Sequence, residues 1–349
     1  MFIIFAPIIP DMCKNEANIA KRYNTFAGYF REKYGERLQK LVIDAGFTCP
    51  NRDGKLGRGG CTFCDNNAFH PGYSTAGKPL LRQLDEGIEF HRVRYRKSMH
   101  YLAYFQSYSN TYAPLERLRE LYCEALSHPE VVGLVIGTRP DCVSPGVLDF
   151  LEDLAEGRAI PLWNRILEDG RTLTAPIVIV EYGIESCYDR TLNRVNRGHD
   201  FLTARQAVER TAARGIPVGA HFMLGLPGES RSMMLEQCAL INELPLLSAK
   251  FHQLQIVKGT RMEREFEEKP EDFVTFGLDE YIDFFVDILE RLRPDLYIER
   301  FVSEVPPRFV SRTPWGLIRN VEILRLLDAR LEERNTFQGR LLQGERSLI

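Results

Sequence analysis

Six short apolar stretches recur along the chain, and segments with a helical spacing of apolar residues lie between them. We predict buried strands at residues 41–45, 101–105, 131–136, 177–182, 218–224 and 251–257. Strands that alternate with helices are typical of right-handed βαβ units around a parallel sheet. Six such units predict an α/β fold, a partial (β/α)6 TIM-like barrel. In that architecture the reacting groups gather at the carboxyl ends of the strands.

The chain has 349 residues, of which 44% are hydrophobic, and this suffices for the core of one large barrel. We expect residues 22–300 to form that barrel, with 1–21 as an N-terminal extension and 301–349 as a C-terminal extension. Residues 157–175 are predicted to be an insertion or a long loop between the third and fourth units. The last extension is predicted to become helical from about residue 320.

No apolar run approaches the roughly 20 residues that a membrane-spanning helix needs. The N-terminus "MFIIFAPIIPDMCKNE" has no basic start and contains two prolines, so it does not read as a signal peptide. We therefore expect a cytoplasmic protein without membrane association, whose thiols stay reduced. The net charge of −3 gives no general affinity for nucleic acid, although a local basic patch would.

Three of the eight cysteines lie in the loop "GFTCPNRDGKLGRGGCTFCDN", directly after the first predicted strand. They are Cys49, Cys61 and Cys64. A reducing compartment argues against a disulfide knot here. A structural zinc site normally has four ligands in two close pairs, and only His70 offers a fourth, so zinc stays open. Three thiolates also suit an iron–sulfur cube, which leaves one iron for an exogenous ligand. The other cysteines are widely spaced: Cys13, Cys123, Cys142, Cys187 and Cys238.

Several further motifs accompany this loop, namely "YFQSYSNTYAP", "GTRPDC", "NRGHD" and "LGLPGES". With Phe63 inside the final CxxC, they make the chain resemble the radical S-adenosylmethionine (SAM) superfamily from about residue 22 to 314. The resemblance is to the YhcC-like group of the branch that includes the elongator catalytic subunit. The first gap between cysteines has eleven residues instead of the usual three of CxxxCxxC, and longer gaps occur in that branch.

The resemblance implies that Cys49, Cys61 and Cys64 bind a [4Fe–4S] cluster whose open iron is chelated by S-adenosylmethionine. An electron from the reduced cluster would cleave this cofactor to a 5′-deoxyadenosyl radical, which removes a hydrogen atom from the substrate. It also implies a reducing partner such as flavodoxin or ferredoxin.

Two residues are expected near the adenine of the cofactor. Phe63 would pack against it, or would simply be a core aromatic. Gly225 in "GLPGE" would let the backbone approach it, because glycine has no side chain. An ordinary strand-to-helix turn, with Glu229 favoured at the helix start, is the other interpretation.

Four residues are expected near the methionine part. Gln106 and Ser107 take the place of the donor that usually meets the amino group. Glu181, predicted to close the fourth strand, matches an acidic position that contacts the cofactor. Arg197 matches a basic position that pairs with the carboxylate, which suits the fork of donors on arginine.

Further candidate residues lie on the substrate side. Arg139, Asp141 and Cys142 follow the third strand and are candidates for substrate contacts, although Cys142 also fits as a small buried hydrophobe. His221 and His252 lie in apolar strands, where a core histidine and a barrel-lining substrate contact are both possible.

The sequence does not name the substrate, and tRNA or a nucleotide, a small metabolite and a protein side chain all stay open. "HRVRYRK" at residues 91–97 is basic with an internal aromatic, and arginines 308, 312 and 319 surround Trp315. Such residues could form an RNA-binding groove or a solvated helix face. A non-catalytic zinc-binding RNA module and an iron–sulfur electron carrier are the alternative functions.

Overall fold

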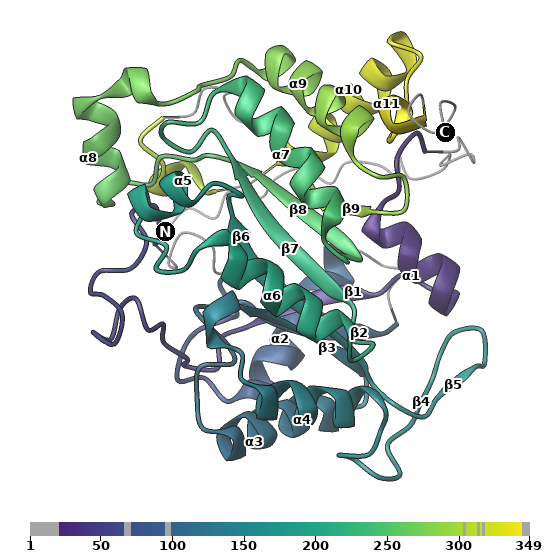
Figure 1. The fold of residues 1–349 in the computed structure, drawn as a ribbon. Helices are drawn as coiled ribbons and strands as arrows, with labels where there is room; N and C mark the ends of the chain where they lie inside the picture. The colour runs from purple at the N-terminus through teal and green to yellow at the C-terminus, as the bar shows by residue number, and fades with distance from the viewer. Residues whose placement is uncertain are drawn as a thin grey trace, which may run out of the picture.

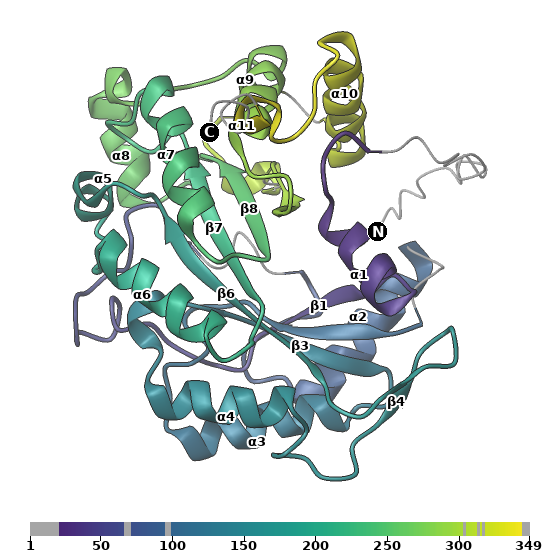
Figure 2. The ribbon, with the colours of Figure 1, turned by 45° about the vertical axis from the view of Figure 1, so that its right-hand side comes forward.

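A computed structural model describes residues 21–65, 71–94, 99–302, 305–312, 315 and 318–343. Its centre is one parallel sheet in the order β1-β2-β3-β6-β7-β8-β9, curled into a half-barrel (Figures 1 and 2). The strands are β1 Gln39–Ile43, β2 Tyr101–Phe105, β3 Val131–Thr138, β6 Ile177–Glu185, β7 Val218–Leu224, β8 Ser248–Gln253 and β9 Tyr297–Arg300. The partial barrel expected from the sequence is confirmed, with a seventh parallel strand added.

That seventh strand, β9, has the sequence YIER, and only Ile298 in it is buried. Its short length and charged residues hide it from a search for apolar runs. β8 also differs from expectation, because it begins at Ser248 and ends at Gln253. Beyond that end, Val257 forms an isolated antiparallel bridge with Val310.

Helices cover the convex outer face of the sheet (Figure 2). The helices are α1 Phe26–Tyr34, α2 Leu80–Arg94, α3 Leu115–Ser127, α4 Pro145–Ala155, α5 Asp189–Arg194, α6 Phe201–Ala212, α7 Arg231–Glu243, α8 Arg261–Glu268, α9 Leu278–Arg291, α10 Asn320–Glu333 and α11 Arg340–Gln343. Their starts are set by local chemistry, as where the Asp200 side chain accepts from the Thr203 N–H before α6. No helix in the described part of the chain is long and apolar enough to cross a membrane.

The amino end of the half-barrel is closed by α1. Side chains alternate between the two faces of each strand, so the inner face has its own apolar cluster. That cluster, here called the apolar floor, contains Phe26, Tyr29 and Phe30 of α1 with Leu102, Val135, Ile177 and Ile179 of the sheet. Just before α1, Asn24 accepts a backbone hydrogen bond from Ile298 and thereby covers the edge of β9. Packed apolar side chains therefore fill the inner face at this end.

The predicted insertion at 157–175 contains a small antiparallel hairpin, β4 Arg165–Ile166 and β5 Thr172–Leu173. Arg165 donates to the carbonyl groups of Leu126 and His128, at the end of α3. The hairpin thus lies at the amino end of the sheet, away from the carboxyl ends of the strands (Figure 1).

The predicted C-terminal extension packs on the barrel through α10. Ile323, Leu327 and Leu331 are buried in the main core cluster. Glu290 of α9 accepts from Arg340 at 3.0 Å, which ties α11 to the same helix. The predicted N-terminal extension, with Cys13, lies outside the described residues apart from Lys21.

Candidate active site

The three candidate cysteines lie in one loop after β1. Cys49 and Cys61 are buried, Cys64 is partly exposed, and all three thiols are free. The backbone N–H of Arg52 donates to the Cys49 carbonyl while its guanidinium donates to the Cys64 carbonyl at 2.8 Å. Gly60, next to Cys61, has a φ of 79°, which residues with side chains rarely adopt. Arg52 therefore links the backbone at Cys49 to the backbone at Cys64, at the two ends of the loop.

A buried arginine lies against these thiols. Arg197 Nη1 is 3.4 Å from Cys61 Sγ, and its Nη2 donates to the Gly183 carbonyl at 2.5 Å. Burial alone would lower the pKa of Arg197, but Cys61 and Glu185 raise it overall. Asn51 Nδ2 also lies 3.8 Å from Cys61 Sγ. A fixed positive charge and an amide donor beside the sulfur favour an anionic group bound to the thiolates.

Two arginine donors beside the loop are buried without a hydrogen-bond partner within the part of the chain that the structure describes. They are Nη1 of Arg139 and Nε of Arg197. A buried donor left unpaired costs about 1–3 kcal/mol, so such atoms mark a place where a further acceptor is expected. Inorganic sulfides, thiolates and the carboxylate of an amino acid are acceptors of that kind. The donor set therefore fits a thiolate-bound iron–sulfur cluster with an anionic ligand.

A single metal ion fits less well. No group of three His, Cys, Asp or Glu side chains in the described ranges is placed to bind one ion. A cube differs in this respect, because each cysteine binds a different iron atom. His70, the fourth zinc ligand considered above, lies outside the described residues.

The predicted substrate-side residues follow β3, in the 3₁₀ helix η2 Pro140–Cys142. Arg139 donates through Nε and Nη2 to both carboxylate oxygens of Asp141, at 2.9 Å each. Cys142 lines a pocket of about 600 Å³ together with Lys55 and Tyr112. Burial and the neighbouring Asp141 raise the pKa of Cys142 to about 12, so its thiol stays protonated near neutral pH. These residues thus form a group at a strand end, as expected.

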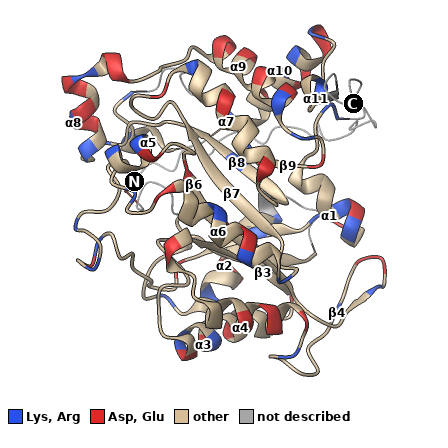
Figure 3. Cartoon of the chain, in the orientation of Figure 1, with Lys and Arg blue, Asp and Glu red and all other residues tan. Residues whose placement is uncertain are grey.

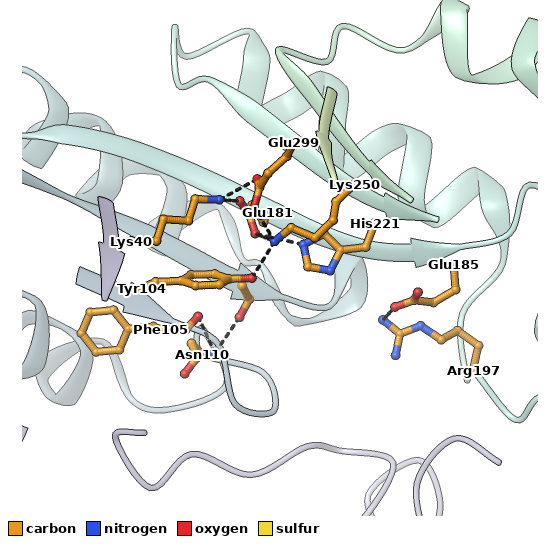
Figure 4. A network of polar contacts seen from close by, with 11 residues as sticks. Lys40, Tyr104, Phe105, Asn110, Glu181, Glu185, Arg197, His221, Lys250 and Glu299 are labelled. Carbon is orange, nitrogen blue, oxygen red and sulfur yellow. Dashed lines mark hydrogen bonds and ion pairs between the residues drawn. The ribbon is translucent and has the colours of Figure 1, made fainter. Parts of the chain in front are cut away.

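The segment after β2 is fixed by a residue that sequence reasoning missed. Asn110 Nδ2 donates to the carbonyls of Phe105 at 3.0 Å and Gly137 at 2.7 Å, joining the ends of β2 and β3 (Figure 4). This holds Gln106 and the buried Ser107 at the mouth of the half-barrel. Their predicted contact with the amino group of a cofactor stays a prediction.

The two residues predicted to contact the adenine lie beside the same apolar cluster. Phe63 is partly buried and packs on the cluster of Val195, Leu226, Met262, Phe266 and Phe273. Gly225 has a φ of 91°, and a Cβ atom there would lie 2.9 Å from the Val274 carbonyl. Glycine is therefore required at 225 by the backbone itself. Glu229 is buried and accepts from Ser186 Oγ at 2.5 Å, instead of standing exposed at a helix start.

Glu181 does not close its strand, because β6 continues to Glu185. Tyr182 and Ile184 are both buried in the outer core and carry the apolar alternation beyond the predicted end. The acidic residue at the strand end is Glu185, 3.7 Å from Arg197 and with an uncommon φ of 73°. The continued alternation at 182 and 184 was the signal that could have found it.

Glu181 lies instead on the inner face, among charged residues (Figure 4). His221 Nε2 contacts its carboxylate at 2.9 Å, and the rings of His221 and His252 are 5.5 Å apart. Burial lowers the pKa of His252 well below its ordinary value. Neither histidine is a plain core residue, since both project from strands toward the interior of the half-barrel.

The basic residues considered for RNA binding do not all come together. Residues 95–98 lie outside the described ranges. Trp315 packs on Tyr281 at a centroid distance of 5.0 Å, so it belongs partly to the core. Arg308 and Arg312 do reach the carboxyl end of β8, because the segment that carries them exchanges backbone hydrogen bonds with residues 256–258.

Comparisons with known proteins agree with this geometry. Residues 49–241 match the family described as the Radical SAM superfamily, and residues 247–333 match the Radical_SAM C-terminal domain. The chain is 34% identical to the uncharacterized protein YtqA of Bacillus subtilis over 333 residues, which cover 94% of this chain and 95% of that one. It is 35% identical to protein YhcC of Escherichia coli over 249 residues, which cover 71% of this chain and 74% of that one.

A weaker likeness links the chain to the elongator branch. It is 25% identical to a tRNA uridine(34) acetyltransferase of Dehalococcoides mccartyi over 183 residues, 52% of this chain and 35% of that protein. The fold resembles Elp3 of the archaeon Methanocaldococcus infernus with a TM-score of 0.61 and 14% identity, over 86% of this chain and 64% of that one. The superfamily match begins at Cys49 and spans more than half of the residues. The protein is therefore a radical SAM enzyme and belongs to the radical SAM superfamily.

Proposed function

We propose that this protein binds a [4Fe–4S] cluster through Cys49, Cys61 and Cys64 and uses it with S-adenosylmethionine to start radical chemistry on a substrate. When bound and reduced, these groups supply the 5′-deoxyadenosyl radical that takes a hydrogen atom. The observation that carries the proposal is the set of three free thiols with two buried arginine donors beside them.

Residues of this chain would orient the cofactor. Arg197 offers its unpaired Nε to the methionine carboxylate while its other nitrogens stay fixed on Gly183 and Cys61. Gln106 and Ser107 would face the amino group. Phe63 and Gly225 would hold the adenine. Glu185, at the end of β6, is the acidic residue best placed beside Arg197.

For the substrate we propose tRNA. The relative named as a tRNA uridine(34) acetyltransferase supports this, as does the positively charged rim that Lys258, Arg308 and Arg312 offer near the end of β8. A small molecule is the second candidate, favoured by the pocket of about 600 Å³ beside Cys142. We also infer a cytoplasmic location, where free thiols stay reduced.

The reductant would be a flavodoxin or ferredoxin. Leu56 is exposed, and Lys55 and Arg58 flank it in the same loop as the cysteines. A small apolar and basic surface at this place would suit an acidic electron carrier, because opposite charges speed the encounter.

The test is metal analysis followed by electron spin resonance of the anaerobically reconstituted protein. About four irons and four sulfides per chain, with a spectrum of the reduced cluster that changes when S-adenosylmethionine is added, would support the proposal. One zinc without sulfide would indicate the zinc-binding module. A cluster whose spectrum ignores the cofactor would indicate an electron carrier.

A further inference from the structure

Six polar side chains from six strands meet on the inner face of the half-barrel (Figure 4). We call this group the lumen network: Lys40 of β1, Tyr104 of β2, Glu181 of β6, His221 of β7, Lys250 of β8 and Glu299 of β9. Charged residues otherwise lie mainly on the outer helices and loops (Figure 3). The lumen network is therefore an exception that needs a reason.

Glu181 is the centre of the network. Its carboxylate contacts Lys40, lies 3.2 Å from Lys250 Nζ and accepts from His221 Nε2 at 2.9 Å. Glu299 pairs with Lys40 at 2.6 Å and with Lys250 at 2.8 Å. The two lysines and two glutamates balance in charge, so the imidazole of His221 is not needed for that balance.

Stability alone does not explain this arrangement. Replacing buried ion pairs with apolar residues is often neutral or stabilising, and the apolar floor shows that this fold fills its inner face with such residues. The Lys40–Glu299 pair has a structural role, since it joins β1 and β9, the two edges of the sheet. That role needs neither Glu181 nor His221.

The network lies next to the cysteine loop. His221 pairs in register with Gly183 on the neighbouring strand. The Gly183 carbonyl accepts from Arg197, which contacts Cys61, and a Cβ atom at 183 would lie 2.6 Å from Arg197 Nη2. From the amino to the carboxyl end of β6, its inner face first meets the apolar floor and then carries Glu181. Beyond Glu181 lies the contact with Arg197, which also touches the cysteine loop. His221 thus stands one strand away from the place where radical chemistry would begin.

The hydrogen bond to Glu181 fixes the chemistry of the imidazole. Burial alone would raise the pKa of Glu181, but Lys250 and Lys40 outweigh it and hold that pKa well below its ordinary value. An ionised carboxylate only accepts, so Nε2 of His221 carries a proton, and Nδ1 is the nitrogen that is free to accept one in the neutral ring. Nδ1 points away from Glu181 (Figure 4), and the His221 side chain is 20% exposed.

We propose that His221 is the proton-transfer residue of the reaction, with Glu181 as its positioning residue. This rests on the proposed function. The substrate would carry an N–H or O–H group next to the carbon that loses its hydrogen atom. The heteroatom–hydrogen bond breaks, its electron pair stays on the substrate, and the proton forms a bond to Nδ1. The resulting imidazolium is paired with Glu181 and later gives the proton to water.

The wild-type holoenzyme gives a first test. In ¹⁵N-histidine NMR of the oxidised protein at neutral pH, His221 should be the Nε2–H tautomer, with Nδ1 unprotonated. In E181Q the ¹⁵N signals of the His221 ring should shift toward the values of a mixture of the two tautomers. A wild-type His221 protonated only on Nδ1 would overturn the proposal without any variant having to fold.

A second test compares variants in cells that lack the native gene. Total tRNA nucleosides and small metabolites are compared by mass spectrometry after complementation with wild type, H221Q, C61A or M223L. H221Q should keep the iron content of wild type yet lose the enzyme's product at least 100-fold, matching C61A. M223L, which changes the next inward position of β7, should retain it. Product from H221Q within threefold of wild type would refute the role of His221. Product from C61A at the level of wild type would instead refute the proposed function, and with it the reaction in which His221 is proposed to act.

Discussion

The charge balance of the lumen network predicts a specific, non-additive response to substitution. E181Q leaves Lys40 and Lys250 facing only Glu299, so a buried group with zero net charge becomes positive by one unit. Breaking a buried pair in this way typically costs 3–5 kcal/mol, and we expect a loss of about 3 kcal/mol in the free energy of unfolding. K250M removes one positive charge and should cost a similar amount.

The double variant E181Q/K250M should cost less than the two single changes together. It leaves Lys40 paired with Glu299, so the balance of charge is restored. We expect a coupling of about 2 kcal/mol between the two sites, which is within the range measured for residues in one ion-pair network. The assay is urea denaturation of the cluster-free protein, followed by circular dichroism.

The deficit of E181Q should also depend on pH. Burial already lowers the pKa of Lys250, even with two carboxylates beside it. Removing Glu181 lowers the pKa of Lys250 further. When the pKa of a base is lower in the native state than in the unfolded chain, the protein loses stability as the pH falls below the pKa of the unfolded chain. The deficit should therefore be larger at pH 7 than at pH 9. This account of the network would be refuted if the cost of the double variant equalled the sum of the two single costs within about 0.5 kcal/mol. A deficit of E181Q that does not change with pH would refute it as well.

Three further predictions concern other parts of the molecule. C61A should lose its iron and all cleavage of S-adenosylmethionine. C238A, at a buried position of α7, should keep both, as measured by an iron assay and by release of 5′-deoxyadenosine. R197K should weaken binding of S-adenosylmethionine at least tenfold in equilibrium dialysis, because lysine cannot reach the sulfur and the carbonyl at once; unchanged affinity would remove Arg197 from the site. E290Q should loosen the C-terminal helices. Burial alone would raise the pKa of Glu290, but hydrogen bonds led by that from Arg340 lower it, so its stabilising effect is present above pH 4–5 and fades in more acid solution. Melting curves of wild type and E290Q should therefore converge at low pH, and a constant gap would contradict the assignment.

The sequence predicted those features that depend on local pattern. Strands β1, β2, β3, β6 and β7 show up as apolar runs because both faces of a parallel sheet in this architecture are covered. The cysteine loop and the Arg139–Asp141 pair follow such runs directly, so their place at strand ends could be inferred from order alone.

Features that depend on the curvature of the sheet could not be predicted. Lys40, Lys250 and Glu299 look like surface charges in the sequence, and the last two make their strands look less like strands. They meet only because the sheet curls and brings its two edges, β1 and β9, near each other. Glu185 was missed for a different reason, since its strand was ended three residues too early.

The central claim is that this protein cleaves S-adenosylmethionine by radical chemistry at the three-cysteine loop. The most direct measurement is mass-spectrometric detection of 5′-deoxyadenosine from the reconstituted, reduced protein, tested with and without unfractionated tRNA. We predict that the nucleoside forms with wild type and is absent when Cys49, Cys61 and Cys64 are all replaced by alanine. Its formation at equal rates by both proteins, or its absence from a wild type that holds an intact cluster and is given tRNA and cell metabolites, would contradict the account.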